Sequence, residues 1–152
     1  MQSGKYRERA EIMIWRNGKV LMTVNASPGG TWYGLPGGGI DEGETPIQAG
    51  IREALEEVGI KVRDAQDTFE IGIKEGVPRA IADNTIMYKP SKTYLIRGTY
   101  DGTDTSRLGI EGDSMNFKFV TPREFAQTMR EHYKKNAGGT GDHALREIMK
   151  YC

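Results

Sequence analysis

The segment AEIMIWRNGKVLMTVN, residues 10–25, carries alternating apolar residues on both sides of Asn17-Gly18. An Asn-Gly pair between such runs is the strongest short-range signal of a two-residue type I′ hairpin turn, because both residues tolerate a positive φ. The sequence therefore predicts that the fold begins with two antiparallel strands paired through this turn.

A stretch rich in glycine and proline, SPGGTWYGLPGGG (residues 27–39), follows the hairpin and predicts a loop. The pattern then becomes helical from about Thr45 to Val58, and Gly59 is suited to end that helix in the left-handed conformation. We expect the loop and the helix to form one structural unit.

The rest of the chain alternates between extended and helical patterns. Strands are predicted around residues 61–74, 92–102 and 116–120, and a last short helix at about 143–150. Another helix should begin near Thr121, which supplies an N-cap before a proline and a capping-box glutamate, Glu124. Because most strands follow one another directly, the order favours an α/β (α+β) fold, with a mixed sheet sandwiched between helices.

The size and charge of the chain limit its class. With 152 residues it is expected to form a single domain over 1–152. The chain has 21 Lys and Arg residues and 21 Asp and Glu residues. Because these charges balance, the sequence gives no strong signal of nucleic-acid binding, and we expect no membrane partner. The single cysteine, Cys152, and a start without an apolar signal segment predict a cytoplasmic protein. His132 and His143 are interpreted as solvated surface residues rather than metal ligands.

The helix predicted at 45–58 would have two unlike sides. Its apolar side consists of Ile47, Ile51, Ala54, Leu55 and Val58, and the nearly opposite side of Glu53, Glu56 and Glu57. Glutamates three or four positions apart repel by about 0.2–0.5 kcal/mol a pair, and only one cation, Arg52, is close in sequence. Either this side is a solvated surface, or a bound cation balances it.

Two features favour the cation. Gly37-Gly38-Gly39 precede the helix and let the main chain approach a bound group closely. Glu44 lies just outside the helix start, where a carboxylate is favoured by the helix dipole whether or not it binds anything. Together with the three helical glutamates, these residues predict a set of hard oxygen ligands for Mg²⁺ or a similar cation.

The same residues resemble a family signature. Gly38, Glu44 and the run REALEEVGI, residues 52–60, are similar to the Nudix box, Gly-x5-Glu-x7-Arg-Glu-U-x-Glu-Glu-x-Gly-U, in which U is a bulky aliphatic residue. One position departs from the pattern, because Ala54 stands where an aliphatic residue is expected. The hairpin, the LPGGG segment and FKFVTPREF also resemble their Nudix counterparts.

The resemblance implies a Nudix-type mixed β-sheet between helices and a Nudix hydrolase. Such an enzyme cuts a pyrophosphate bond in a nucleoside diphosphate linked to another group, with Mg²⁺, or alternatively Mn²⁺, as its cofactor. It implies metal ligands at Glu56 and Glu57, a ligand or general base at Glu53, and a ligand at the Gly38 carbonyl. Glu44 is implied as a supporting catalytic carboxylate and Arg52 as an orienting residue.

The general base is left open, because some family members draw it from a later loop. Glu111 and Asp113 precede a predicted strand and are candidates for that base or for an extra ligand, against the simpler interpretation as an acidic turn. Trp32 and Tyr33 could line a substrate cleft or belong to the core. Asn116, with Phe69 and Tyr88, is a weaker candidate for substrate binding.

The expected partner is a nucleotide-type small molecule, and a homodimer is left open. Our first expectation is ADP-ribose, dinucleoside polyphosphates or FAD and NADH, although Pro78 lies out of register for the ADP-ribose marker. One alternative is a (d)NTP pyrophosphohydrolase of the nucleotide-pool sanitising type. Another, from a different class, is a catalytically silent nucleotide-sensing Nudix module, although all four box glutamates are present.

Overall fold

A computed structural model describes residues 7–28, 30–74, 78–81, 84–87, 91–102, 116–135 and 141–152 of the chain. It opens with the predicted hairpin, made of β1 (Arg7–Arg16) and β2 (Lys19–Ser27). Asn17 and Gly18 have φ values of 51° and 75°, and Arg16 pairs with Lys19 across the turn. These positive values are those of a type I′ turn, which confirms the local prediction.

The glycine-rich segment contains two strands, β3 (Gly30–Gly34) and β4 (Gly37–Gly39), so the prediction of a loop was wrong there. β3 pairs with β2, and β4 pairs with β1 with Gly38 opposite Ala10. The Ile12 amide also donates to the Pro36 carbonyl at 3.0 Å. Backbone pairing needs no side chain, and therefore glycines can form a strand that residue preferences do not reveal.

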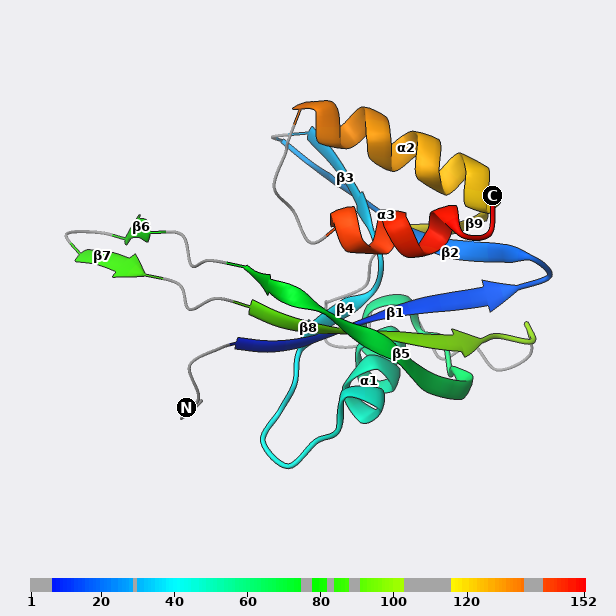
Figure 1. The fold of residues 1–152 in the computed structure, drawn as a ribbon, viewed down its shortest axis with the longest axis horizontal. Coiled ribbons are helices and arrows are strands. Elements are labelled where there is room, and N and C mark those ends of the chain that lie inside the picture. Colours follow the sequence, from blue (N-terminus) through cyan, green and yellow to red (C-terminus); the bar gives the residue numbers. More distant parts are fainter. Residues whose placement is uncertain are drawn as a thin grey trace.

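Seven strands form one mixed sheet in the order β3-β2-β1-β8-β5, with β4 attached to β1 and β9 to β2 (Figure 1). The remaining members are β5 (Arg63–Lys74), β8 (Ser91–Thr99) and β9 (Asn116–Val120). The β1–β8 pair is parallel and the other pairs are antiparallel. A separate antiparallel pair, β6 (Pro78–Ile81) and β7 (Asn84–Met87), was not predicted.

Helices cover both faces of this sheet, as predicted. Figure 1 shows α1 (Pro46–Val58) on one side and α2 (Pro122–Lys135) with α3 (Gly141–Met149) on the other. Thr121 caps α2, because its Oγ1 accepts a hydrogen bond from the Glu124 amide at 3.1 Å. No helix in the described part of the chain combines the length and the apolar character that crossing a membrane requires.

Alternating residues of β1 divide the core into two clusters. Ile12 and Ile14 pack in the same cluster as Ala54 and Val58 of α1. Met13 belongs to the second cluster, which contains α2 and α3 residues such as Phe125, Met129 and Ile148. Since successive side chains of a strand point to opposite faces, β1 anchors both helical layers and fixes the position of α1.

Candidate functional site

Local hydrogen bonds fix both ends of α1. Thr45 is the N-cap: its Oγ1 accepts from the Gln48 amide at 3.1 Å, and the Gln48 side chain accepts from the Thr45 amide at 2.9 Å. Gly59 ends the helix with φ 69°, and its amide donates to the Leu55 carbonyl at 3.1 Å. With both ends fixed, each acidic side chain of α1 has a defined direction.

The burial of α1 differs from the pattern expected from an ideal helical wheel. Ala54 and Val58 are fully buried, so the small residue at the aliphatic position of the box still packs in the core. Leu55 is 37% exposed, and its assignment to the core side was wrong. Glu57 is only 7% exposed although it was assigned to the opposite, acidic side. Glu57 is buried because β4 also packs against α1, beside its glutamates.

The glycines of β4 make that close packing sterically feasible. The Gly37 amide donates to Oε1 of Glu57 at 2.7 Å, which holds this buried carboxylate against the strand. A Cβ placed on Gly38 would lie 2.4 Å from Oε1 of Glu53, a distance that real Cβ atoms essentially never show. A side chain at position 38 would therefore displace Glu53, whereas a Cβ on Gly39 would meet nothing within 4 Å.

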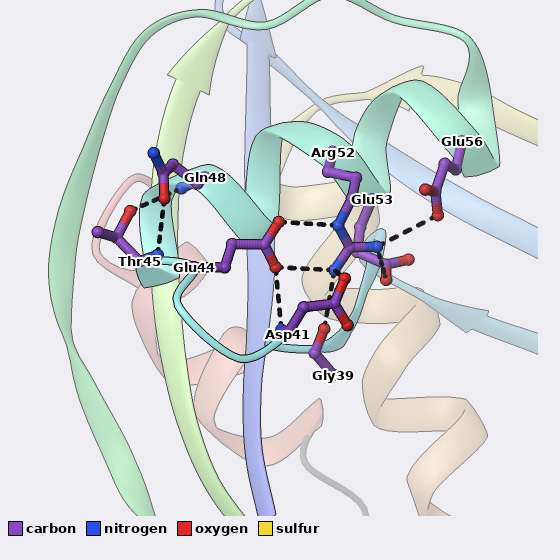
Figure 2. A network of polar contacts seen from close by, with 8 residues as sticks. All are labelled: Gly39, Asp41, Glu44, Thr45, Gln48, Arg52, Glu53 and Glu56. Carbon is purple, nitrogen blue, oxygen red and sulfur yellow. Dashed lines mark hydrogen bonds and ion pairs between the residues drawn. The ribbon is translucent and has the colours of Figure 1, made fainter.

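Figure 2 shows the Arg52 guanidinium at the centre of the acidic residues. Its Nε and Nη2 bind the two carboxylate oxygens of Glu44 at 2.9 and 3.0 Å. Its Nη1 donates to Glu53 at 2.9 Å and to Glu56 at 3.3 Å. Its Nη2 also donates to the Gly39 carbonyl at 2.9 Å. One planar cation thus links the start of α1, its acidic side and the glycine strand.

The ionisation of this cluster follows from its geometry. The hydrogen bonds from Arg52 lower the pKa of Glu44 below its ordinary value of 4.5, against a smaller opposing effect of burial. In return, the carboxylates of Glu44 and Glu53 raise the pKa of Arg52. Glu44 also accepts a hydrogen bond from the Asp41 amide at 3.0 Å. Thr45, not Glu44, caps the helix, so the main partner of Glu44 is the arginine.

The chemistry of these side chains, rather than their present arrangement, suits a hard divalent cation. Glu53 and Glu56 both accept a hydrogen bond from Nη1 of Arg52. Their carboxylates therefore lie close together, around one positive charge. Glu56 is 46% exposed and Glu53 14% exposed at the side chain, so this region is open to solvent on the Glu56 side. Among the described residues, no group of three or more acidic, His or Cys side chains is placed so that it could hold a metal ion as it stands. Carboxylate and carbonyl oxygens are the ligands that Mg²⁺ and Mn²⁺ prefer.

The other candidate residues lie away from α1. Trp32 is 46% exposed on β3, while Tyr33 is half-buried against the core cluster of α2 and α3. Val24 of β2 has a cross-strand partner on each side, Tyr33 of β3 on one and Asn116 of β9 on the other. Glu111, Asp113 and Tyr88 lie outside the described residues, as do the side chains of Phe69 and His143.

His132 is not simply a solvated residue. Its ring lies 5.1 Å from that of Trp32 and 5.8 Å from that of Tyr33, in edge-to-face geometry.

Two residues were not anticipated: Asp41, whose carboxylate lies 3.6 Å from Arg52, and Asn25, the cross-strand partner of Trp32. Both contacts depend on the path of the chain after the hairpin, and no local pattern indicates them.

Comparison with known proteins finds relatives of similar sequence. An RNA pyrophosphohydrolase of Bartonella clarridgeiae is 34% identical over 107 residues, which cover 62% of this chain and 61% of that protein. A MutT-like protein of Streptomyces ambofaciens is 29% identical over 124 residues, covering 82% of this chain and 69% of that protein. The chain thus spans about three fifths of the length of the first of these relatives.

The fold has a counterpart among solved structures. A crystal structure of an ADP compounds hydrolase matches 95% of this chain and 71% of its own, with a TM-score of 0.64 at 18% identity, a likeness of fold alone. A family model described as the NUDIX domain matches residues 5–137. On the combined grounds of the box residues, the mixed sheet between helices and this match, the chain belongs to the NUDIX domain family.

Proposed function

We propose that this chain is a divalent-metal-dependent pyrophosphohydrolase, with residues 1–152 acting as one NUDIX domain. The observation that carries the proposal is the convergence of Glu44, Glu53 and Glu56 on the guanidinium of Arg52, beside the glycine strand. Family membership supports a nucleotide-type substrate. Mg²⁺ is the metal we propose, with Mn²⁺ as a substitute.

Each residue of the cluster has a distinct proposed role. Glu56 and Glu57 would hold the metal, joined by the Gly38 carbonyl. When bound, the metal neutralises diphosphate oxygens and lowers the pKa of a coordinated water. Glu53, whose carboxylate lies against Gly38 and accepts a hydrogen bond from Arg52, would serve as the base that accepts the proton of the attacking water. Arg52 is a positioning residue that holds Glu53 and Glu56 through its bidentate anchor on Glu44.

The substrate is a separate question with three candidates. Our first candidate is an adenosine diphosphate derivative, such as ADP-ribose, a dinucleoside polyphosphate, NADH or FAD. The second is the 5′ polyphosphate end of an RNA, which is favoured by the name of the Bartonella relative. A (d)NTP is a third candidate, and the same bond chemistry would apply to all of them.

The test is nucleotide release, measured by chromatography, from a panel that includes ADP-ribose, diadenosine polyphosphates, NADH, FAD, the (d)NTPs and a short 5′-triphosphate RNA. Each reaction is run with Mg²⁺, with Mn²⁺ and with a chelator. The proposal predicts metal-dependent release of AMP, of (d)NMP, or of pyrophosphate from the RNA. No release from any substrate by folded, metal-supplied protein would contradict it and favour a silent nucleotide-sensing module.

Paired variants separate the site from its surroundings. Glu57→Gln removes a buried carboxylate but keeps an oxygen that can accept the hydrogen bond from the Gly37 amide. Glu42→Gln is the matched control, because Glu42 is exposed and lies just before α1. We expect the first variant to lose most turnover and the second to keep it, and equal activities would refute the assignment.

A further inference from the structure

Trp32 is the most exposed large apolar side chain among the described residues, with 46% of its surface accessible. Its ring is nevertheless held in place, because the ring of His132 from α2 lies 5.1 Å away at an interplanar angle of 80°. The neighbouring residue, Tyr33, packs toward the core and contacts the same histidine at 5.8 Å. A fixed but exposed indole offers a flat surface for stacking.

An amide accompanies this ring. Asn25 of β2 is directly opposite Trp32 in the antiparallel register, and it is exposed. Directly opposed residues project to the same face of a sheet with Cβ atoms about 4.5–5.5 Å apart, so Asn25 and Trp32 are neighbours on one face. A stacking surface next to an asparagine is the combination that recognises a nucleobase, and asparagine can bind adenine through two hydrogen bonds.

The chain connects this pair directly to the acidic site. Only Tyr33, Gly34, Leu35 and Pro36 separate Trp32 from Gly37, whose amide binds Glu57. Five residues, even when fully extended, span at most about 18 Å. The indole therefore lies close enough to Gly37 for an extended nucleotide to reach from one to the other. A solvent-facing tryptophan far from Gly37 in the sequence would not be limited in this way.

We infer that Trp32 and Asn25 form a platform for an adenine base of the substrate, Trp32 by stacking and Asn25 through its amide. This inference rests on the proposed function for its biological meaning, because it names the substrate class of that site. An experiment can nevertheless refute base binding without refuting hydrolysis, because base binding needs neither a metal nor a scissile bond.

The experiment is a fluorescence titration with AMP, which has no pyrophosphate bond, in the presence of a chelator. The sequence has two tryptophans, Trp15 and Trp32, so Trp15→Phe makes Trp32 the sole indole reporter. We expect saturable quenching by AMP with a Kd at least fivefold lower than for UMP. Adding Asn25→Ala should weaken AMP binding until its Kd is within about twofold of that for UMP.

Two controls locate the signal. Trp32→Phe, which keeps Trp15, should show no saturable quenching, and Met149→Ala, which truncates another exposed apolar residue, should bind AMP normally. If Trp15→Phe fails to fold, the difference between the wild-type and Trp32→Phe titrations reports the same signal. No AMP quenching, equal quenching in Trp32→Phe, or an unchanged preference in Asn25→Ala would overturn the platform. Hydrolysis without quenching would refute the platform alone, and quenching without hydrolysis would refute the proposed pyrophosphohydrolase alone.

Discussion

Replacing Gly38 by alanine tests whether the position of the Glu53 carboxylate matters for catalysis. The new Cβ would lie 2.4 Å from Oε1 and 2.6 Å from Cδ of Glu53, both below the 3.0 Å limit of real contacts. The carboxylate must therefore move by roughly half an ångström or more. The end of a side chain can move at little cost in stability, and the fold should tolerate the change.

The expected loss is in catalysis. A misplacement of about 1 Å in a catalytic geometry can cost about 100-fold in rate, so a shift of half that size predicts a loss of about tenfold in kcat/KM, or about 1.4 kcal/mol. We expect the melting temperature of Gly38→Ala, measured in chelator by circular dichroism, to stay within about 2 °C of wild type. Steady-state kinetics on the best substrate of the panel gives the loss.

Gly39→Ala is the matched control on the next residue. Its Cβ would meet nothing within 4 Å, and neither glycine has a left-handed backbone that would itself exclude alanine. The Gly39 carbonyl that accepts from Arg52 is retained in the variant. We expect kcat/KM within twofold of wild type. If both variants lost activity equally, or if Gly38→Ala were fully active, the role assigned to the contact between Gly38 and Glu53 would be wrong.

The remaining predictions concern the charges of the cluster. Arg52→Ala should lower the free energy of unfolding in chelator by about 2–3 kcal/mol, because partly buried carboxylates lose charged hydrogen bonds, and a urea titration that shows no loss would contradict this. The fold lowers the pKa of Glu44, so its ionised carboxylate stabilises the protein at pH values above 4.5, the ordinary pKa of a glutamate. This contribution is lost as the pH falls through the lowered pKa. The stability difference between wild type and Glu44→Gln should accordingly shrink in urea titrations below about pH 4, and a difference that grows there would reverse the sign. Mg²⁺ at 100 times its Kd should stabilise the fold by about 2.7 kcal/mol, which raises the melting temperature by roughly 5–10 °C, whereas an unchanged midpoint would exclude tight binding to the folded state.

Features set by neighbouring residues were predictable from the sequence. The Asn17-Gly18 turn, the Thr121 cap and the Gly59 helix end each depend on a few adjacent residues, and the structure has all three. The grouping of Glu53 and Glu56 with Arg52 was predicted in the same way, because these residues are neighbours along one helix.

Features set by distant contacts were not predictable. β3 and β4 are strands only because β2 and β1 pair with them, and their glycines give no preference for strand. A helical wheel places Leu55 inside and Glu57 outside, but in the structure Leu55 is exposed and Glu57 is buried against β4. The cross-strand pair of Asn25 and Trp32 depends on the same long-range register, which a single sequence does not contain.

We propose that a divalent metal completes the positive charge that the glutamates of α1 require. The most direct test is a titration with Mn²⁺ followed by electron paramagnetic resonance, because free Mn²⁺ gives a strong signal that decreases on binding. We predict that wild type and Glu42→Gln bind Mn²⁺ alike, and that Glu56→Gln and Glu57→Gln each bind at least tenfold more weakly. Equal binding by all four proteins, or no binding by wild type, would contradict the metal site.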